Sequence, residues 1–243
     1  MNTETSGARA AYETLAPGYD ELTKANDYEM WLGEVLLPEL EERGLRRGSA
    51  FDVGCGTGRA FEPLLERGWR VAGCDLSPAM LSEARRKFGD SVPLTVADAR
   101  ELPPLGPFEL VLALNDVVNY LTGEGDLERA LRGMRANLAP EGLLLFDSNS
   151  LGLFRSQFTP DAGDGGIFEA TVATPGVEPH VHRQRHFPLP RLREAIEAAG
   201  LECLAILGQR ELAGRVLLAD PADEQRDEKL VCIARRPAAQ ATR

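Results

Sequence analysis

Residues 50–58, with the sequence Ala-Phe-Asp-Val-Gly-Cys-Gly-Thr-Gly, decide the fold class of this chain. The first four residues predict the end of a buried strand, and the glycines that follow predict a tight turn into a helix. A turn without side chains lets backbone N–H groups approach a ligand closely. Glycines that merely ease the turn are the alternative. The spacing G-x-G-x-G, followed by Arg59 and Ala60, differs from the G-x-G-x-x-G of dinucleotide-binding turns.

Strand and helix patterns alternate along most of the chain. Short apolar runs predict strands at residues 50–53, 70–74, 93–96, 110–114, 143–146, 201–207 and 229–234. Amphipathic stretches predict helices at residues 8–15, 28–42, 60–67, 78–88, 126–138 and 189–199. This alternation favours right-handed βαβ units. We therefore expect an α/β fold with a seven-stranded, mostly parallel sheet and helices on both faces.

Composition limits the class of protein and its partners. With 43% hydrophobic and 27% charged residues, the 243-residue chain is typical of a globular domain. Its net charge of −11 disfavours nucleic acid and anionic lipid as partners. Four cysteines lie far apart and predict free thiols in a reducing compartment. Because residues 1–9 lack an apolar signal region, and no stretch would span a bilayer, we expect a cytoplasmic protein without a membrane partner.

Acidic residues end two of the predicted strands. Open α/β sheets bind ligands beyond the carboxyl ends of their strands. Asp75 ends the second strand and could accept hydrogen bonds from the two hydroxyls of a ribose. Helix capping is the alternative for Asp75, although Ser77 is better placed for it. Asp98 ends the third strand and could accept a hydrogen bond from an adenine amine, which a plain dinucleotide site would not explain.

Four segments together resemble, in order and spacing, the core of the class I S-adenosylmethionine-dependent methyltransferases of small-molecule type. They are residues 52–58, residues 73–81 (Gly-Cys-Asp-Leu-Ser-Pro-Ala-Met-Leu), residues 97–99 (Ala-Asp-Ala) and residues 138–144 (Leu-Ala-Pro-Glu-Gly-Leu-Leu). The resemblance implies a Rossmann-like fold with S-adenosyl-L-methionine as cofactor. It also implies methyl transfer to a nitrogen or oxygen of a small molecule, such as a natural product, an amino sugar or an amino acid.

The resemblance implies one domain with four parts. Residues 1–48 form an N-terminal helical cap over the carboxyl edge of the sheet, and residues 49–150 form the cofactor-binding core. Residues 151–188 form a short insertion after the fifth strand, as a loop or a small antiparallel unit, on the substrate side. Residues 189–236 add the last helix and strands, and both ends of the chain are expected to fray.

The same resemblance assigns roles to individual residues of the cofactor site. Asp52 would lie near the methionine ammonium group, Asp75 would hold the ribose, and Asp98 would meet the adenine edge. Residues 12–20 are similar to a tyrosine-bearing segment that folds over the cofactor, where an aromatic face favours the sulfonium by roughly 0.5–2 kcal/mol. Packing within the cap is the alternative for these tyrosines. The implied cofactor-binding residues are Tyr12, Tyr19, Asp52, Gly54, Gly56, Gly58, Asp75, Leu76, Met80, Asp98, Ala99 and Leu114.

Four residues are candidates for contact with the methyl acceptor. Asp116 and Asn119 follow the fourth strand, where the family's transferred methyl lies, and could orient the acceptor; a polar cap on the next helix is the alternative. His182 and His186 lie in a cluster of three histidines that begins at His180, and either could act as a base or a hydrogen-bond donor. Surface histidines without a role are the alternative. A metal site is not expected, because the cluster lacks a further ligand at suitable spacing.

Two other functions remain open at the level of the sequence. An NAD(P)-dependent oxidoreductase can share this fold, but Asp98 would then be unexplained. A non-catalytic module that binds S-adenosylmethionine would keep the same motifs. The acceptor, the number of methyl groups transferred and the oligomeric state are not determined by these motifs.

Overall fold

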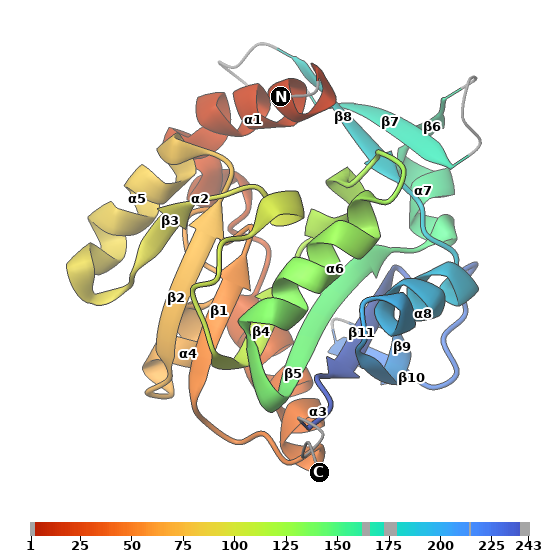
Figure 1. Ribbon diagram of the computed structural model, residues 1–243. Coiled ribbons are helices and arrows are strands. Elements are labelled where there is room, and N and C mark those ends of the chain that lie inside the picture. Colours follow the sequence, from red (N-terminus) through yellow and green to blue (C-terminus); the bar gives the residue numbers. More distant parts are fainter. Residues whose placement is uncertain (1–2, 162–165, 173–178, 214, 239–243) are drawn as a thin grey trace.

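Eight strands form the central sheet of the computed structural model, which describes residues 3–161, 166–172, 179–213 and 215–238 (Figure 1). The strand order is β10-β9-β11-β5-β4-β1-β2-β3. Strands β5, β4, β1, β2 and β3 run parallel, while β11, β9 and β10 pair antiparallel. The strands are β1 Ser49–Val53, β2 Arg70–Asp75, β3 Leu94–Val96, β4 Phe108–Ala113, β5 Leu138–Asn149, β9 Glu202–Leu212, β10 Arg215–Ala219 and β11 Lys229–Arg235.

Helices cover both faces of this sheet and its carboxyl edge. The α-helices are α1 Thr3–Leu15, α2 Tyr19–Leu22, α3 Leu37–Glu42, α4 Glu62–Glu66, α5 Pro78–Phe88, α6 Asp126–Asn137, α7 Leu151–Gln157 and α8 Leu189–Ala198. A π-helix, η2, spans Glu29–Leu36, and short 3₁₀ turns are η1 Ala16–Gly18, η3 Gly89–Ser91, η4 Ala99–Glu101 and η5 Val117–Tyr120. Within the described residues, no helix is long and apolar enough to cross a membrane.

Two hydrophobic clusters lie on opposite sides of the sheet, because successive residues of a strand face opposite ways. Phe51 belongs to the cluster under α6 and α8, while its neighbour Ala50 belongs to the cluster under η2, α3, α4 and α5. Phe51 is fully buried and stacks on Phe108 at 5.2 Å between ring centres. Both faces are therefore covered, as the sequence predicts for a parallel sheet.

The N-terminal segment differs in part from the predicted cap. Helix α1 lies at the carboxyl edge of the sheet, against α5 and β8, as expected (Figure 1). The next helical segment instead covers one face of the sheet, where Leu32, Leu36 and Leu40 are fully buried. The apolar side of this segment is large, and packing against a face of the sheet buries it. Helix α1 begins at Thr3, and residues 1–2 and 239–243, at the two ends that are expected to fray, lie outside the described part.

The sheet has one strand more than the seven predicted. Strand β10 pairs only with the end of β9, which runs to Leu212 rather than to the predicted end at Leu207. The apolar residues of β10 form a short edge strand, and such a strand leaves little pattern in the sequence. The α/β class and the mostly parallel core are as predicted.

The insertion after β5 folds into a second, three-stranded antiparallel sheet preceded by α7. Its strands are β6 Thr159–Pro160, β7 Ile167–Val172 and β8 His180–Arg185, in the order β6-β7-β8. Strand β8 contacts α1 and η5, so the insertion lies beside the carboxyl edge of the central sheet. Residues 162–165 and 173–178 of the predicted insertion lie outside the described residues.

Candidate active site

A cavity of about 340 Å³ opens at the carboxyl ends of β1, β2 and β4. Its size falls in the range of small-ligand pockets, roughly 300–1,000 Å³. Ten of the twelve residues predicted to bind the cofactor line it. These ten are Tyr12, Tyr19, Gly54, Gly56, Asp75, Leu76, Met80, Asp98, Ala99 and Leu114. Asp52 and Gly58 lie behind this wall, so the structure brings the predicted motifs together around one cavity.

The glycine turn forms part of the cavity wall, at Gly54, Cys55, Gly56 and Thr57. Its first two N–H groups, at Gly54 and Cys55, donate to the carbonyl of Cys74 at 2.8 and 2.9 Å. Gly54 has a φ of 74°, and a Cβ there would lie 2.5 Å from Val117 Cγ2. Gly56 has a φ of 54°, and a Cβ there would meet no described heavy atom within 4 Å. The space beside Gly56 is thus available to a ligand, while Gly54 is required by the turn itself.

Asp75 ties the end of β2 to this turn. Its carboxylate accepts from the N–H of Gly56 at 2.9 Å and from the N–H of Ser77 at 2.8 Å. Burial raises the pKa of Asp75, and these two backbone hydrogen bonds act against that rise. Ser77, and not Asp75, caps α5, because its Oγ accepts from Met80 N at 3.3 Å. The remaining lone pairs of Asp75 face a cavity in which two vicinal hydroxyls could be held.

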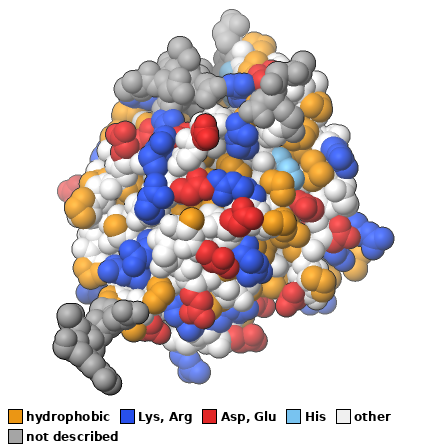
Figure 2. Space-filling view, turned by 45° about the vertical axis from the view of Figure 1, so that its right-hand side comes forward, with side chains coloured by type: hydrophobic (Ala, Val, Ile, Leu, Met, Phe, Trp, Pro, Cys, Tyr) orange, Lys and Arg blue, Asp and Glu red, His pale blue; other side chains and the backbone are white. Residues whose placement is uncertain are grey.

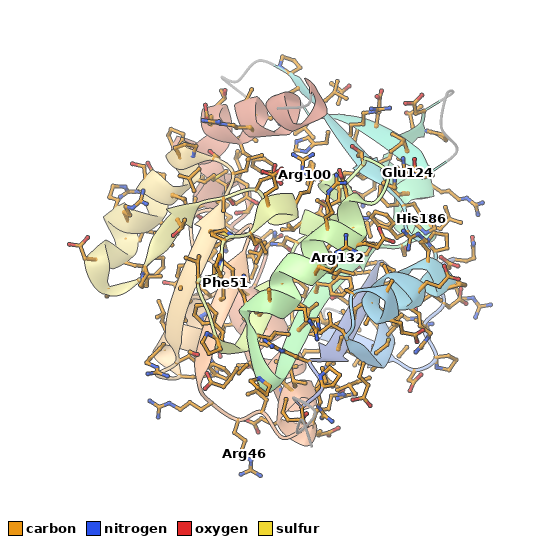
Figure 3. All side chains as sticks on the ribbon, in the orientation of Figure 1. Arg46, Phe51, Arg100, Glu124, Arg132 and His186 are labelled. Atoms are coloured by element: carbon orange, nitrogen blue, oxygen red, sulfur yellow. The ribbon has the colours of Figure 1, made fainter. Side chains whose placement is uncertain are left out.

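Asp98 also lines the cavity, but it is paired with an arginine that the sequence analysis did not consider. Arg100 donates to Asp98 Oδ1 from its backbone N and its Nε, both at 2.9 Å. Burial raises the pKa of Asp98, but the hydrogen bonds and charge of Arg100 outweigh it and hold that pKa below its ordinary value. Figure 3 shows Arg100 below α1, near the rim of the site. Asp98 is therefore ionised and oriented before any ligand binds.

The surroundings of Asp52 indicate whether a cation fits beside the glycine turn. Its side chain is buried, and its Oδ2 has no hydrogen-bond partner among the described residues. Burial first, and the charge of Asp75 second, raise the pKa of Asp52 well above its ordinary value. An orphaned buried oxygen needs a donor. The open space at Gly56, the Asp75 carboxylate in the cavity wall and the unsatisfied Asp52 fit a ligand with a ribose and an ammonium group.

An aromatic cluster closes the other end of the cavity. Tyr12 lies 6.0 Å from Tyr19 and 5.9 Å from Tyr120 between ring centres, and its hydroxyl lies 3.0 Å from that of Tyr120. Burial raises the pKa of Tyr19 to about 12 and moves those of Tyr12 and Tyr120 upward. The phenols are therefore neutral near pH 7. Sequence analysis missed Tyr120, whose only signal is an aromatic residue shortly after the fourth strand.

Asp116 lies at the carboxyl end of β4, next to this cluster. Asn115 and Asp116 have φ values of 60° and 56°, a left-handed conformation that such residues adopt at a cost. The Asp116 carboxylate accepts a hydrogen bond from Gln184 Nε2 of β8, and its N–H donates to Asp147 Oδ2 at 3.1 Å. Mainly through burial, the pKa of Asp116 is raised to about 6. Asp116 is not a wall residue of the cavity, but its charge acts on all three tyrosines.

Asn119 is engaged in holding the backbone. It is fully buried, and its Nδ2 donates to Ser148 Oγ at 3.0 Å and to the carbonyl of Arg185 at 2.8 Å. Its Oδ1 accepts from Asn149 N at 2.9 Å. The side chain thus joins η5 to β5 and β8, and both of its amide hydrogens are used.

The predicted histidines lie in two different environments. His182 hydrogen-bonds through Nδ1 to the hydroxyl of Tyr120, and burial lowers the pKa of His182 to about 4, so the ring is neutral at pH 7. His186 lies 3.3 Å from Glu224 and packs edge-on against Phe154. Figure 3 shows His186 on the side where α7 and α8 lie, away from Arg100. The structure therefore brings His182, but not His186, into contact with a wall residue of the cavity.

Comparison with known proteins agrees with this geometry. Residues 50–142 match the family model described as a methyltransferase domain. YqeM of Bacillus subtilis, described as a candidate methyltransferase, is 37% identical over 144 residues, which cover 57% of this chain and 56% of that protein. The dTDP-3-amino-3,6-dideoxy-alpha-D-glucopyranose N,N-dimethyltransferase of Streptomyces fradiae is 30% identical over 173 residues, 70% of this chain and 66% of that enzyme.

A solved structure extends the likeness to nearly the whole fold. The S-adenosylmethionine-dependent methyltransferase of Clostridium acetobutylicum superposes with a TM-score of 0.72 at 21% identity, covering 94% of this chain and 100% of that one. Residues 50–142 are therefore similar to a methyltransferase domain, and the fold is that of a solved S-adenosylmethionine-dependent methyltransferase. The chain spans less than two thirds of the length of both curated relatives.

Proposed function

We propose that this protein is an enzyme that transfers the methyl group of S-adenosyl-L-methionine to an amine nitrogen of a small molecule. The observation that carries the proposal is the position of Asp116, a half-buried carboxylate whose charge acts on Tyr12, Tyr19 and Tyr120 of the cavity wall. A carboxylate and aromatic faces both favour a cation. An incoming ammonium group matches this environment better than a hydroxyl does.

The cofactor half is assigned to residues of the cavity wall and to Asp52, which lies behind that wall. The backbone at Gly54 and Gly56 would approach the methionine part, Asp52 would attract its ammonium group, and Asp75 would accept from the ribose hydroxyls. The residues assigned to the adenine are Leu76, Met80, Asp98 and Ala99. When bound, S-adenosylmethionine supplies an electrophilic methyl group on a sulfonium.

Asp116 would prepare the acceptor for reaction. A pKa of about 6 leaves this carboxylate mostly ionised at pH 7, yet close enough to neutrality to take a proton. Proton transfer from the ammonium to Asp116 frees the nitrogen lone pair. Tyr12, Tyr19 and Tyr120 would exclude water and align the amine, since positioning supplies much of the acceleration in such displacements. His182 would act through Tyr120 as a positioning residue.

The name of one relative supports a class of acceptor. The Streptomyces fradiae enzyme is named for a sugar amine, which supports amino sugars as acceptors.

Acidic and basic side chains are interspersed on the face shown in Figure 2, so this face offers no uniformly basic surface for nucleic acid. The four cysteines are free thiols, which supports a cytoplasmic location.

A two-stage experiment tests the proposal. Calorimetric titration with S-adenosylhomocysteine should show saturable binding, and NADH should not bind. Labelled S-adenosylmethionine is then offered with a panel of amino sugars and amino acids, and with sugars in which a hydroxyl replaces the amine. We expect label only in the amines, and a roughly 10²- to 10⁴-fold lower rate for Asp116→Asn with unchanged homocysteine binding. Labelled hydroxyl sugars, or an unimpaired Asp116→Asn variant, would contradict it.

A further inference from the structure

A buried ion pair lies directly behind Asp116. Lys229 of β11 and Asp147 of β5 lie on neighbouring antiparallel strands, and Lys229 Nζ is 2.5 Å from Asp147 Oδ2. The Asp147 side chain is 0% exposed and that of Lys229 is 17% exposed. The Lys229 ammonium also lies 5.4 Å from the centre of the Trp31 ring. Neither charge belongs to the wall of the cavity.

One oxygen links this pair to the proposed base. Asp147 Oδ2, which holds Lys229, also accepts the backbone N–H of Asp116 at 3.1 Å. That hydrogen bond fixes the left-handed turn at Asn115 and Asp116. The position of the Asp116 carboxylate therefore depends on Asp147 Oδ2, the same oxygen that pairs with Lys229.

Stability alone gives a poor account of this pair. Asp147 Oδ1 is buried and has no hydrogen-bond partner in the part of the chain that the structure describes. Buried ion pairs with unsatisfied atoms are often no more stable than an apolar replacement of similar size. A role in the site explains why two charges are placed here.

We propose that Lys229 and Asp147 are positioning residues that set the charge state of Asp116 with opposite signs. The Lys229 ammonium keeps Asp116 ionised at neutral pH, and Asp147 holds its backbone while offsetting part of that effect. The proposal rests on the proposed function, in which Asp116 takes a proton from the acceptor amine.

Among charged residues, Lys229 and Asp147 have the largest effects on the pKa of Asp116. Tyr12 of α1, Tyr19 of α2 and Tyr120 of η5 face it as neutral phenols. Gln184 of β8 and Asn149 of β5 lower the pKa of Asp116 by hydrogen bonding. Burial raises that pKa most, Lys229 lowers it and Asp147 raises it.

The experiment reads the charge of Asp116 directly. Protein labelled with ¹³C in its aspartate carboxyls is titrated by NMR, and the Asp116 signal is assigned by its loss in Asp116→Asn. Lys229→Gln keeps a donor to Asp147 without the charge and should raise the titration midpoint by about one pH unit. Asp147→Asn keeps the acceptor without the charge and should lower it. Lys229→Arg should restore the wild-type midpoint, and Lys24→Met, at an exposed pair with Glu21, should leave it unchanged.

The signs separate this proposal from a purely structural role. Opposite shifts in the two variants, with pH–rate profiles that move by the same amounts, support it. If Lys229→Gln does not fold, the double variant Lys229→Gln/Asp147→Asn carries no unpaired charge, and its midpoint should lie above that of Asp147→Asn, from which it differs only by loss of the Lys229 ammonium. Unchanged midpoints, or shifts of equal sign, in folded variants would overturn it. Opposite shifts in a protein that methylates no amine would uphold this inference and count against the proposed function instead.

Discussion

Replacement of Asp75 by asparagine should separate cofactor binding from folding. The carboxylate accepts two backbone N–H groups, from Gly56 and Ser77. Asparagine keeps one acceptor but points an amide hydrogen at the other N–H. Losing one hydrogen bond to a charged group costs about 1.5–3 kcal/mol. For a chain of this size, that lowers the melting temperature by roughly 3–12 °C.

The effect on ligand binding should be larger than the effect on stability. Two ribose hydroxyls would lose a charged acceptor, which together weakens S-adenosylhomocysteine binding by about 3 kcal/mol, or roughly 100-fold in Kd. Titration calorimetry at a temperature well below the unfolding transition measures the Kd of S-adenosylhomocysteine, and differential scanning calorimetry measures the melting temperature. Asp90→Asn, at an exposed position in η3, is the matched control and should change neither. A folded Asp75→Asn protein that binds the homocysteine product with wild-type affinity would refute the reasoning.

Further substitutions test other parts of the site and the core. Gly56→Ala and Gly89→Ala both place a side chain at positive φ with no described atom within 4 Å, so each should cost about 1–2 kcal/mol of stability, but only Gly56→Ala should weaken homocysteine binding in calorimetry. Phe51→Ala empties a fully buried position and should lower the free energy of unfolding in urea by about 3–5 kcal/mol; a loss below 1 kcal/mol would contradict the core assignment. The folded-state pKa of Asp116, about 6, exceeds its ordinary value of 3.8, so the folded protein binds this proton more tightly, and stability falls as pH rises from about 4 to 6. Asp116→Asn should remove that pH dependence and be the more stable protein at pH 7 in urea titrations, while wild-type methyl transfer should fall as pH drops below 6.

Local signals predicted which residues line the cavity at the carboxyl edge of the sheet. Helix α5 begins and ends as predicted. Its start is set by the Ser77 cap and Pro78 and its end by Gly89, and all three residues lie within one short segment of the sequence. Asp52, Asp75 and Asp98 lie at or just beyond the carboxyl ends of β1, β2 and β3, and these ends meet at one edge because the strands are parallel. The sequence could therefore place these residues before any coordinates were known.

Features that depend on distant segments could not be predicted in this way. The environment of Asp116 is assembled from Asp147, Gln184 and Lys229, which belong to strands from two sheets. No local periodicity reports that these strands meet. Likewise, η2 has an ordinary amphipathic pattern. Whether this helix packs on a face or at an edge of the sheet depends on how the strands pair, which the local pattern does not show.

The wall of the cavity is drawn from two parts of the chain. Helices α1 and α2 and strand β8 lie outside residues 50–142, the region that matches the family model, while the glycine turn, Asp75 and Tyr120 lie inside it. Under the proposed function, relatives can change the acceptor by changing these three outer segments while the core that would hold the donor stays the same. Exchange of α1, α2 and β8 with the corresponding segments of a relative tests which acceptor these segments select.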